Sequence, residues 1–195
     1  MLNKSQKNSI TKLSVVAMLS AMSFILMLLE FPIIPGLDHL KLDFSDIPAL
    51  VAGIAYGPVA GIAVEFIKNL IELLVKGVGT QMGFGNLMNF IVGCAYVVPF
   101  SICYRKLYKK IGKTKGVLLS SILGILSIIV FGAIANYFVA PLFFKYFLGI
   151  TLDSAGIKTA VIGATAINAI KGTMLSILCY PIVKFLLNKL LYSFK

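Results

Sequence analysis

The chain alternates long uncharged runs with short polar segments. The uncharged runs cover residues 13–29, 47–64, 77–104, 116–144, 159–170 and 172–183, and a single Lys separates the last two. Crossing the roughly 30 Å hydrocarbon core of a bilayer takes about 20 helical residues. Because the runs lack the two-residue alternation of barrel strands, the sequence predicts membrane-spanning α-helices.

The stretch 47–76 fits either one span with an interfacial tail or two helices that break at Tyr56-Gly57-Pro58. Glycine followed by proline is typical of a helix end and a restart. Basic residues favour the break, because Lys and Arg concentrate on cytoplasmic segments. The lysines before the first span and the basic cluster at 105–115 share one side only if four helices connect them.

The sequence therefore predicts an all-α integral membrane protein with six transmembrane helices, cytoplasmic N- and C-termini and an external substrate-binding cavity. The expected helices cover approximately 11–31, 46–56, 58–76, 84–108, 115–140 and 159–192, in a single membrane domain over 1–195. External loops are expected at 32–45, 77–83 and 141–158, with Pro141 ending the fifth helix. We favour a retained first helix over a cleavable signal peptide, because its apolar run exceeds the usual signal core.

Composition agrees with a lipid environment and changes the meaning of the charge. Hydrophobic residues make up 59% of the chain and charged residues 13%, against about 25% charged residues in soluble domains. The balance of 18 Lys+Arg to 7 Asp+Glu would suggest a nucleic-acid partner in a soluble protein. Here most basic residues lie on predicted cytoplasmic segments, so the expected partner is the lipid bilayer and no nucleic acid.

Known catalytic patterns are missing from the sequence. The single histidine, His39, cannot build a His-based triad or a multi-His metal site, and the three Cys residues show no C-x-x-C spacing. Gly112-Lys113-Thr114 resembles the end of a phosphate-binding loop, but Leu107 stands where that motif requires glycine. We therefore expect neither an enzyme nor a metal site nor a cofactor.

Polar residues at membrane depth are the strongest indication of a ligand site. Lys171 lies near the middle of the last helix, where a charge costs roughly 2.5–3.5 kcal/mol on insertion scales. Asn168 lies on nearly the same face, and Asn136 lies at comparable depth on the fifth helix. Two amides and an ammonium suit a neutral, hydrogen-bonding small molecule. Interhelical hydrogen bonding without a ligand is the alternative, and both interpretations stay open.

A second polar stripe follows the third helix at helical spacing, through Glu65, Lys68, Asn69, Glu72 and Lys76. We expect Glu65 to pair with Lys68 and Glu72 with Lys76, which makes the stripe structural rather than substrate-binding.

Further candidates lie near the external ends of the helices. Asn89 points deeper than Asn86 from the start of the fourth helix, and loop 32–45, with Lys41, can fold over an external cavity. Ser45 or Asp46 is expected to cap the following helix. In the first helix, Ala17 and Ala21 form a small-xxx-small pair that permits close helix approach.

Taken together, these features resemble the substrate-binding S components of energy-coupling factor (ECF) vitamin transporters, most of all the riboflavin-specific type. The most specific stretch is LKLDFSDIPALVAGIAYGPVAGIAVEFIKNLIE at 40–72. It is supported by GNLMNFIVG at 85–93, ANYFVAP at 135–141 and NAIKG at 168–172.

The resemblance implies a multi-pass protein of a bacterial membrane that binds riboflavin on the external side, under loop 32–45 and between the last three helices. Asn136, Asn168 and Lys171 match the family's flavin-contacting positions, and Asn89 and Lys41 complete the candidate site.

The resemblance also implies that the Ala17 and Ala21 face docks on a membrane scaffold subunit that works with two ATP-binding subunits. The alternatives are an S component for another vitamin or for phosphorylated flavins, and a non-transporting membrane scaffold protein.

Overall fold

The computed structural model describes residues 4–32, 41–77 and 83–193. Within these ranges it contains six helices and one antiparallel pair of two-residue strands. The elements are α1 (Lys4–Leu28), β1 (Phe31–Pro32), β2 (Lys41–Leu42), α2 (Asp46–Tyr56), α3 (Pro58–Lys76), α4 (Phe84–Ile111), α5 (Lys113–Phe147) and α6 (Ser154–Ser193).

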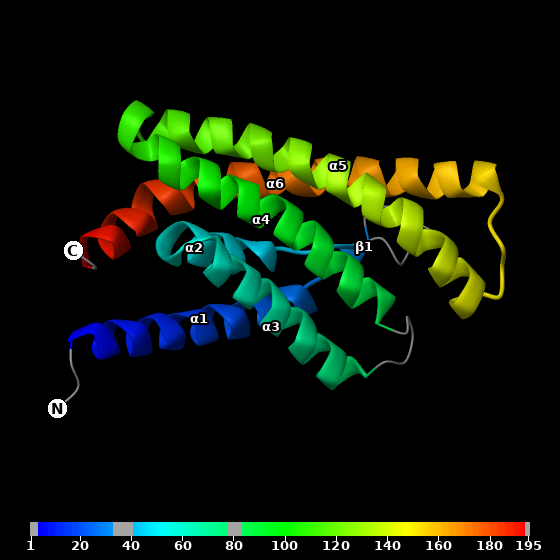
Figure 1. Ribbon diagram of the computed structural model, residues 1–195, viewed down its shortest axis with the longest axis horizontal. Helices are drawn as coiled ribbons and strands as arrows, with labels where there is room; N and C mark the ends of the chain where they lie inside the picture. Colours follow the sequence, from blue (N-terminus) through cyan, green and yellow to red (C-terminus); the bar gives the residue numbers. More distant parts are fainter. Residues whose placement is uncertain (1–3, 33–40, 78–82, 194–195) are drawn as a thin grey trace.

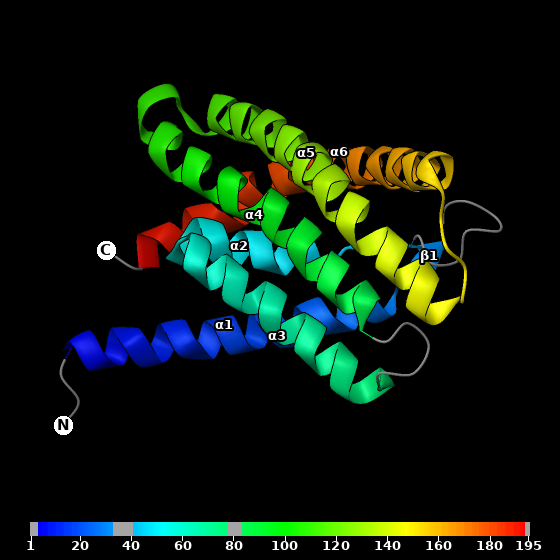
Figure 2. The same cartoon turned by 45° about the vertical axis from the view of Figure 1, so that its right-hand side comes forward.

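The short helix α2 lies at the centre of the molecule. It contacts α1, α3, α4 and α6, which surround it in both views (Figure 1, Figure 2). Close packing needs small residues here: a side chain on Gly53 would meet Ser101 of α4, and one on Gly61 of α3 would meet Val97. The apolar residues of α2 therefore form the middle of the core, together with Tyr96 and Phe100 of α4.

Among the described residues, four helices are long and apolar enough to cross a membrane: Ser9–Leu28, Phe84–Ile111, Lys113–Tyr146 and Ser154–Lys184. The other two, α2 and α3, differ from these four in length and in polarity. With 11 residues, α2 rises only about 16 Å along its axis. Helix α3 has 19 residues but carries the polar stripe that includes Glu65 and Lys68.

The predicted break between α2 and α3 is confirmed, with both helices ending and starting at the expected residues. Gly57 joins them with φ 104° and ψ 163°, a conformation that is essentially restricted to glycine. Its N–H donates to the carbonyl oxygen of Gly53, and Pro58 opens α3. Proline suits this first position because it has no N–H to leave unpaired.

Replacing Gly57 by Ala should destabilise the protein by about 1–3 kcal/mol, because alanine is strained at this φ and ψ. Thermal unfolding in detergent measures the change. Gly163→Ala is the matched control: a Cβ there meets nothing within 4 Å, and its φ is not positive. The control should be as stable as the original chain or more stable, since alanine favours helix. Equal melting temperatures for the two variants would contradict this role of Gly57.

Several helix ends differ from the sequence-based expectation. Helix α1 begins at Lys4, before the expected start near residue 11, and α4 continues to Ile111, past the expected end near residue 108. Three further differences have a local reason. Helix α1 ends at Leu28, because Phe31 precedes Pro32 and residues before proline are biased toward extended backbone. Helix α5 continues through Pro141 to Phe147, so the expected stop at this proline is wrong. Membrane helices tolerate such a proline where neighbouring groups satisfy the freed carbonyl. Helix α6 begins early, at Ser154, because Asp153 caps it by accepting the N–H of Gly156 at 2.7 Å.

The described parts of both chain ends lie at the same end of the molecule as the basic cluster. The first turn of α1, the last turn of α6 and the α4–α5 connection lie at one end (Figure 1). The start of α4, the end of α5 and the start of α6 lie at the other (Figure 1, Figure 2). The basic cluster at 105–115 thus shares an end with the described parts of both chain ends, as an even number of intervening helices requires.

Candidate functional site

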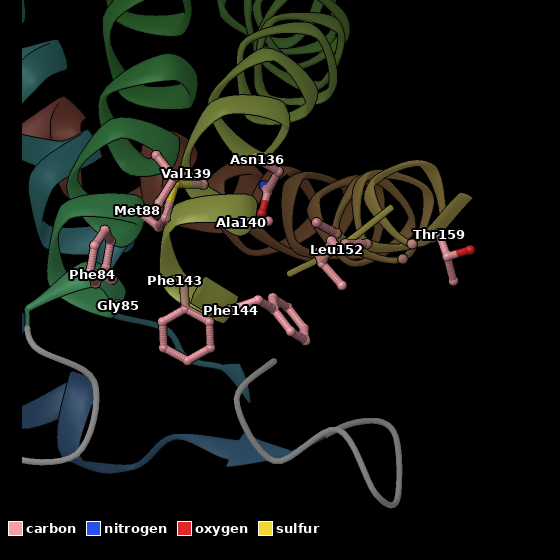
Figure 3. A pocket seen from close by; sticks show the side chains of 14 residues that line it. Phe84, Gly85, Met88, Asn136, Val139, Ala140, Phe143, Phe144, Leu152 and Thr159 are labelled. Carbon is pink, nitrogen blue, oxygen red and sulfur yellow. The ribbon is translucent and has the colours of Figure 1, made fainter. Parts of the chain in front are cut away.

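A cavity of about 450 Å³ opens between α4, α5 and the beginning of α6. Its size falls within the roughly 300–1,000 Å³ typical of small-molecule sites. Figure 3 shows its lining side chains, which include Phe84, Met88, Asn136, Phe143, Leu152 and Thr159. Among the described residues that line it, only Asn136 and Thr159 carry polar side chains. Such a site suits a largely apolar ligand with a few hydrogen-bonding groups.

Asn136 and Asn168 meet at Gly132, as their comparable depth predicts. Asn136 Nδ2 donates a 2.8 Å hydrogen bond to the carbonyl oxygen of Gly132, one turn earlier on α5. A side chain on Gly132 would overlap Nδ2 of Asn168, so the Asn168 amide lies directly against this glycine. Asn168 also lies one turn beyond Ala164, which lines the cavity.

The amide of Asn168 is buried with an open donor. The residue is 7% exposed, and among the described residues nothing accepts a hydrogen bond from its Nδ2. Buried polar groups in native structures almost always have a partner, so an unpaired one calls for an explanation. A ligand that offers an acceptor is one partner that this geometry can accommodate.

Lys171 lies one turn deeper, in a group of five buried side chains that we call the charge cluster: Asp43, Asp46, Glu65, Lys68 and Lys171. Its Nζ is 2.9 Å from Asp46 Oδ2 and 3.5 Å from Asp43 Oδ2. It also donates to Asn89 Oδ1 at 3.1 Å. Lys171 therefore lies next to Asn168 on α6. It is not among the described residues that line the cavity.

Lys68 of α3 is the second cation of the charge cluster. It forms ion pairs with Asp46 and, at 2.8 Å, with Glu65 Oε2, which confirms the expected Glu65–Lys68 pair. It also donates to Ser45 Oγ at 2.7 Å. Asp46 thus bridges both lysines, and the cluster holds three carboxylates against two ammonium groups.

The expectation that Ser45 or Asp46 caps α2 is confirmed for the position of Ser45 and wrong for its side chain. Ser45 occupies the N-cap position of α2, but its side chain makes no capping hydrogen bond. Its hydroxyl instead accepts from Lys68, and Asp46 turns toward the lysines. The reason is energetic, because a buried cation without a carboxylate costs far more than an unmade cap.

Of the remaining sequence candidates, Asn89 is not among the described residues that line the cavity. Asn89 accepts from Lys171, and its Nδ2 lies 3.8 Å from the sulfur of Met27. Lys41 pairs with Pro32 in the β1–β2 ladder, but its side chain lies outside the described residues. Residues 33–40 of the expected covering loop, with His39, also lie outside the described residues.

The outer end of the α3 stripe forms a separate polar contact. Lys76 is 2.7 Å from Glu72 Oε1, as expected from their spacing, and 3.1 Å from Oε1 of Glu30, which lies just after α1. Asn86 donates to Glu72 Oε2 at 2.8 Å, so it holds α4 against α3 and does not line the cavity.

Ala17 and Ala21 lie on the exposed face of α1. The opposite face is packed inward through Val16, Ser20 and Ser23, and the Ser23 hydroxyl donates to the carbonyl oxygen of Ser45. The small-residue pair therefore faces away from the bundle.

Sequence reasoning missed three kinds of site residue. It left the aromatic wall residues Phe84, Phe143 and Phe144 unassigned, because many aromatic residues in this chain face lipid instead. It gave Asp43 only a place in the covering loop and Asp46 only a capping role, although two lysines at membrane depth require nearby carboxylates. It also gave no role to Gly132, whose importance depends on a contact between two helices.

Comparison with known proteins agrees with this architecture. The model of the family "ECF transporter, substrate-specific component" matches residues 11–183. The chain is 40% identical to "Riboflavin transporter FmnP" of Bacillus subtilis (strain 168), over 86% of this chain and 87% of that protein. It is 32% identical to "Riboflavin transporter RibU" of Staphylococcus aureus (strain TCH60), over 91% and 90% of the two chains.

A solved structure of an S component is also similar to this chain. The structure described as "Structure and mechanism of the S component of a bacterial ECF transporter" superposes with a TM-score of 0.74 at 32% identity. The match covers 93% of this chain and 98% of that chain.

Proposed function

The chain belongs to the family of ECF transporter substrate-specific components, and we propose that it is the riboflavin-binding subunit of such a transporter. The observation that carries this proposal is the cavity between α4, α5 and α6, which Asn136 lines and which Asn168 adjoins through their shared contact with Gly132. The relatives named for riboflavin give the ligand. As a transporter subunit the chain captures its substrate and does not convert it.

Riboflavin has the chemistry that this site requires. Its flat ring system offers apolar faces, which suit the walls formed by Phe84, Phe143 and Met88. The polar edge of the ring carries carbonyl acceptors and an imide N–H. Asn168 Nδ2 has a donor to offer, and the Asn136 amide is held in place by Gly132. We assign these two side chains to the polar edge of the ring.

In this proposal Lys171 and Asn89 lie next to Asn168, on the side away from the cavity, and do not contact the ligand. Each is held by the other, and Asp46 and Asp43 neutralise the lysine. The ligand therefore meets no unpaired charge among the described residues beside the cavity, which suits a neutral vitamin. Lys41 is assigned to the loop side of the site, where β2 begins.

We infer that the termini and the basic cluster at 105–115 face the cytoplasm, so the cavity opens toward the outside. Lys and Arg concentrate on cytoplasmic segments, and this end of the molecule carries that cluster (Figure 2). Riboflavin captured outside then reaches the cell through the ECF scaffold subunit and two ATP-binding subunits. The exposed Ala17 and Ala21 face of α1 is the docking surface that we assign to the scaffold.

Titration of riboflavin with the purified chain tests the proposal. Riboflavin fluorescence should be quenched with one ligand bound per chain, and saturating riboflavin should raise the melting temperature. Ala160→Phe fills the cavity and should abolish quenching, whereas Ala166→Phe, on an exposed position of α6, should leave it unchanged. Absent quenching, or equal quenching by all three chains, would refute riboflavin binding in this cavity.

Asn168→Ala should weaken riboflavin binding about tenfold, which corresponds to the loss of about 1.4 kcal/mol from one hydrogen bond. The unliganded protein should keep its melting temperature, because the lost donor has no partner among the described residues. The dissociation constant and the melting temperature together measure this difference.

Asn69→Ala is the control for that substitution. Asn69 is also a buried amide, but it donates to the carbonyl oxygen of Glu65 on α3. It should leave the dissociation constant unchanged. Unaltered riboflavin affinity in Asn168→Ala would remove this side chain from the site.

A further inference from the structure

Gly132 of α5 contacts two amide side chains, Asn136 of the same helix and Asn168 of α6. Its carbonyl oxygen accepts the Asn136 amide from the next turn of the same helix. Its missing side chain leaves the space that Asn168 Nδ2 of α6 occupies. Gly132 is itself buried.

We propose that Gly132 is a positioning residue of the riboflavin site, which sets the orientation of the Asn168 amide without touching the ligand. This inference rests on the proposed function for the identity of the ligand. It adds a residue whose effect on affinity acts through Asn168.

Steric considerations make the position specific for glycine. A Cβ on Gly132 would overlap Asn168 Nδ2 and would lie 3.2 Å from its Cγ. Asn168 sits on a packed helix face, with Ala164 one turn before it and Lys171 nearly one turn after it, all three buried. The amide must then rotate away from its place beside the cavity. Riboflavin then loses a hydrogen-bond donor, the Asn168 amide, that was already oriented toward it. Binding to an oriented group costs less entropy, so the affinity falls.

The contribution of Gly132 is separable from its effect on the helix. An alanine keeps the main-chain carbonyl that Asn136 uses, so the substitution acts on the Asn168 contact alone. Alanine also favours helix over glycine, so a loss of affinity cannot come from a weaker α5.

Gly124→Ala is the matched control on the same helix. A Cβ at Gly124 would come within 2.9 Å of the Tyr96 ring, which makes a comparable steric conflict two turns from Gly132. Both variants should melt at lower temperature than the original chain. Only Gly132→Ala should change riboflavin affinity.

A double-mutant cycle with Asn168→Ala tests the inference. Gly132→Ala should weaken riboflavin binding about tenfold in the original chain and less than about twofold in the Asn168→Ala chain, where no amide is left to displace. Its effect on the melting temperature of the unliganded protein should shrink in the same way. Gly124→Ala should change the dissociation constant less than about twofold in either chain.

The outcomes separate this inference from the proposed function. Unchanged affinity in Gly132→Ala, or an equal loss with and without Asn168, would overturn the positioning role while riboflavin binding by the original chain stands. If the original chain bound no riboflavin, the proposed function would fail. The positioning contact would then be judged by the melting temperatures alone, and additive shifts would overturn it.

Discussion

Replacing Lys68 by Met should lower the free energy of unfolding by about 3–5 kcal/mol, because it removes one cation from a buried charge cluster. Lys68 forms ion pairs with Asp46 and Glu65, and all three side chains are fully buried. Without it, Lys171 alone would face three carboxylates. Reversible unfolding in mixed micelles measures the change.

Two variants give this prediction its controls. Lys76→Met removes an ion-paired lysine from the same helix, but that side chain is 42% exposed, so the loss should stay within about 1 kcal/mol. Glu65→Gln should be tolerated, since it removes the carboxylate that exceeds the number of cations. It should also recover part of the stability lost in Lys68→Met. Equal stability of Lys68→Met and Lys76→Met would contradict a structural role for the cluster.

Replacing Ala17 and Ala21 together by Trp should abolish riboflavin uptake by whole cells while the purified chain still binds riboflavin. Both alanines lie on the exposed face of α1, and small residues there permit another helix to approach closely. The cavity lies between α4, α5 and α6, so these changes leave it intact. Uptake of labelled riboflavin and the fluorescence titration measure the two effects separately.

Leu126→Trp is the corresponding control on the other side of the molecule. Leu126 is an exposed residue of α5, and α5 lies opposite α1 in both views (Figure 1, Figure 2). It should leave both uptake and binding unchanged. Normal uptake by the Ala17 and Ala21 double variant would refute docking through this face of α1.

The features that sequence predicted well depend on neighbouring residues. The break at Gly57-Pro58 was predictable because glycine and proline act on the local backbone. The Glu65–Lys68 pair was predictable because i, i+3 residues share a helix face. Asn136 and Asn168 were singled out because polar groups are costly at membrane depth, and their role in binding stays a prediction.

The features that sequence could not predict depend on contacts between distant segments. Lys171 was singled out as a polar residue, but its partners Asp43 and Asp46 precede it in the chain by 128 and 125 residues. Local spacing cannot show such a pair. The same holds for Gly132, which in sequence is one more glycine in an apolar run and matters only because Asn168 packs against it.

These contacts also change how one substitution is interpreted. From sequence alone, Lys171→Ala should affect binding and leave the bundle folded. In the structure, that change removes the ion pair between Lys171 and Asp43 and one of the two ion pairs of Asp46. A loss of stability therefore accompanies any loss of binding. Asn168 is the more specific probe of the ligand site.

A crystal structure of the chain with bound riboflavin is the most direct measurement of ligand and site together. We expect the ring system between α4, α5 and α6, with its polar edge within hydrogen-bond distance of Asn136 and Asn168. Riboflavin at any other place, or an empty cavity at saturating riboflavin, would contradict the assignment of this cavity as the riboflavin site.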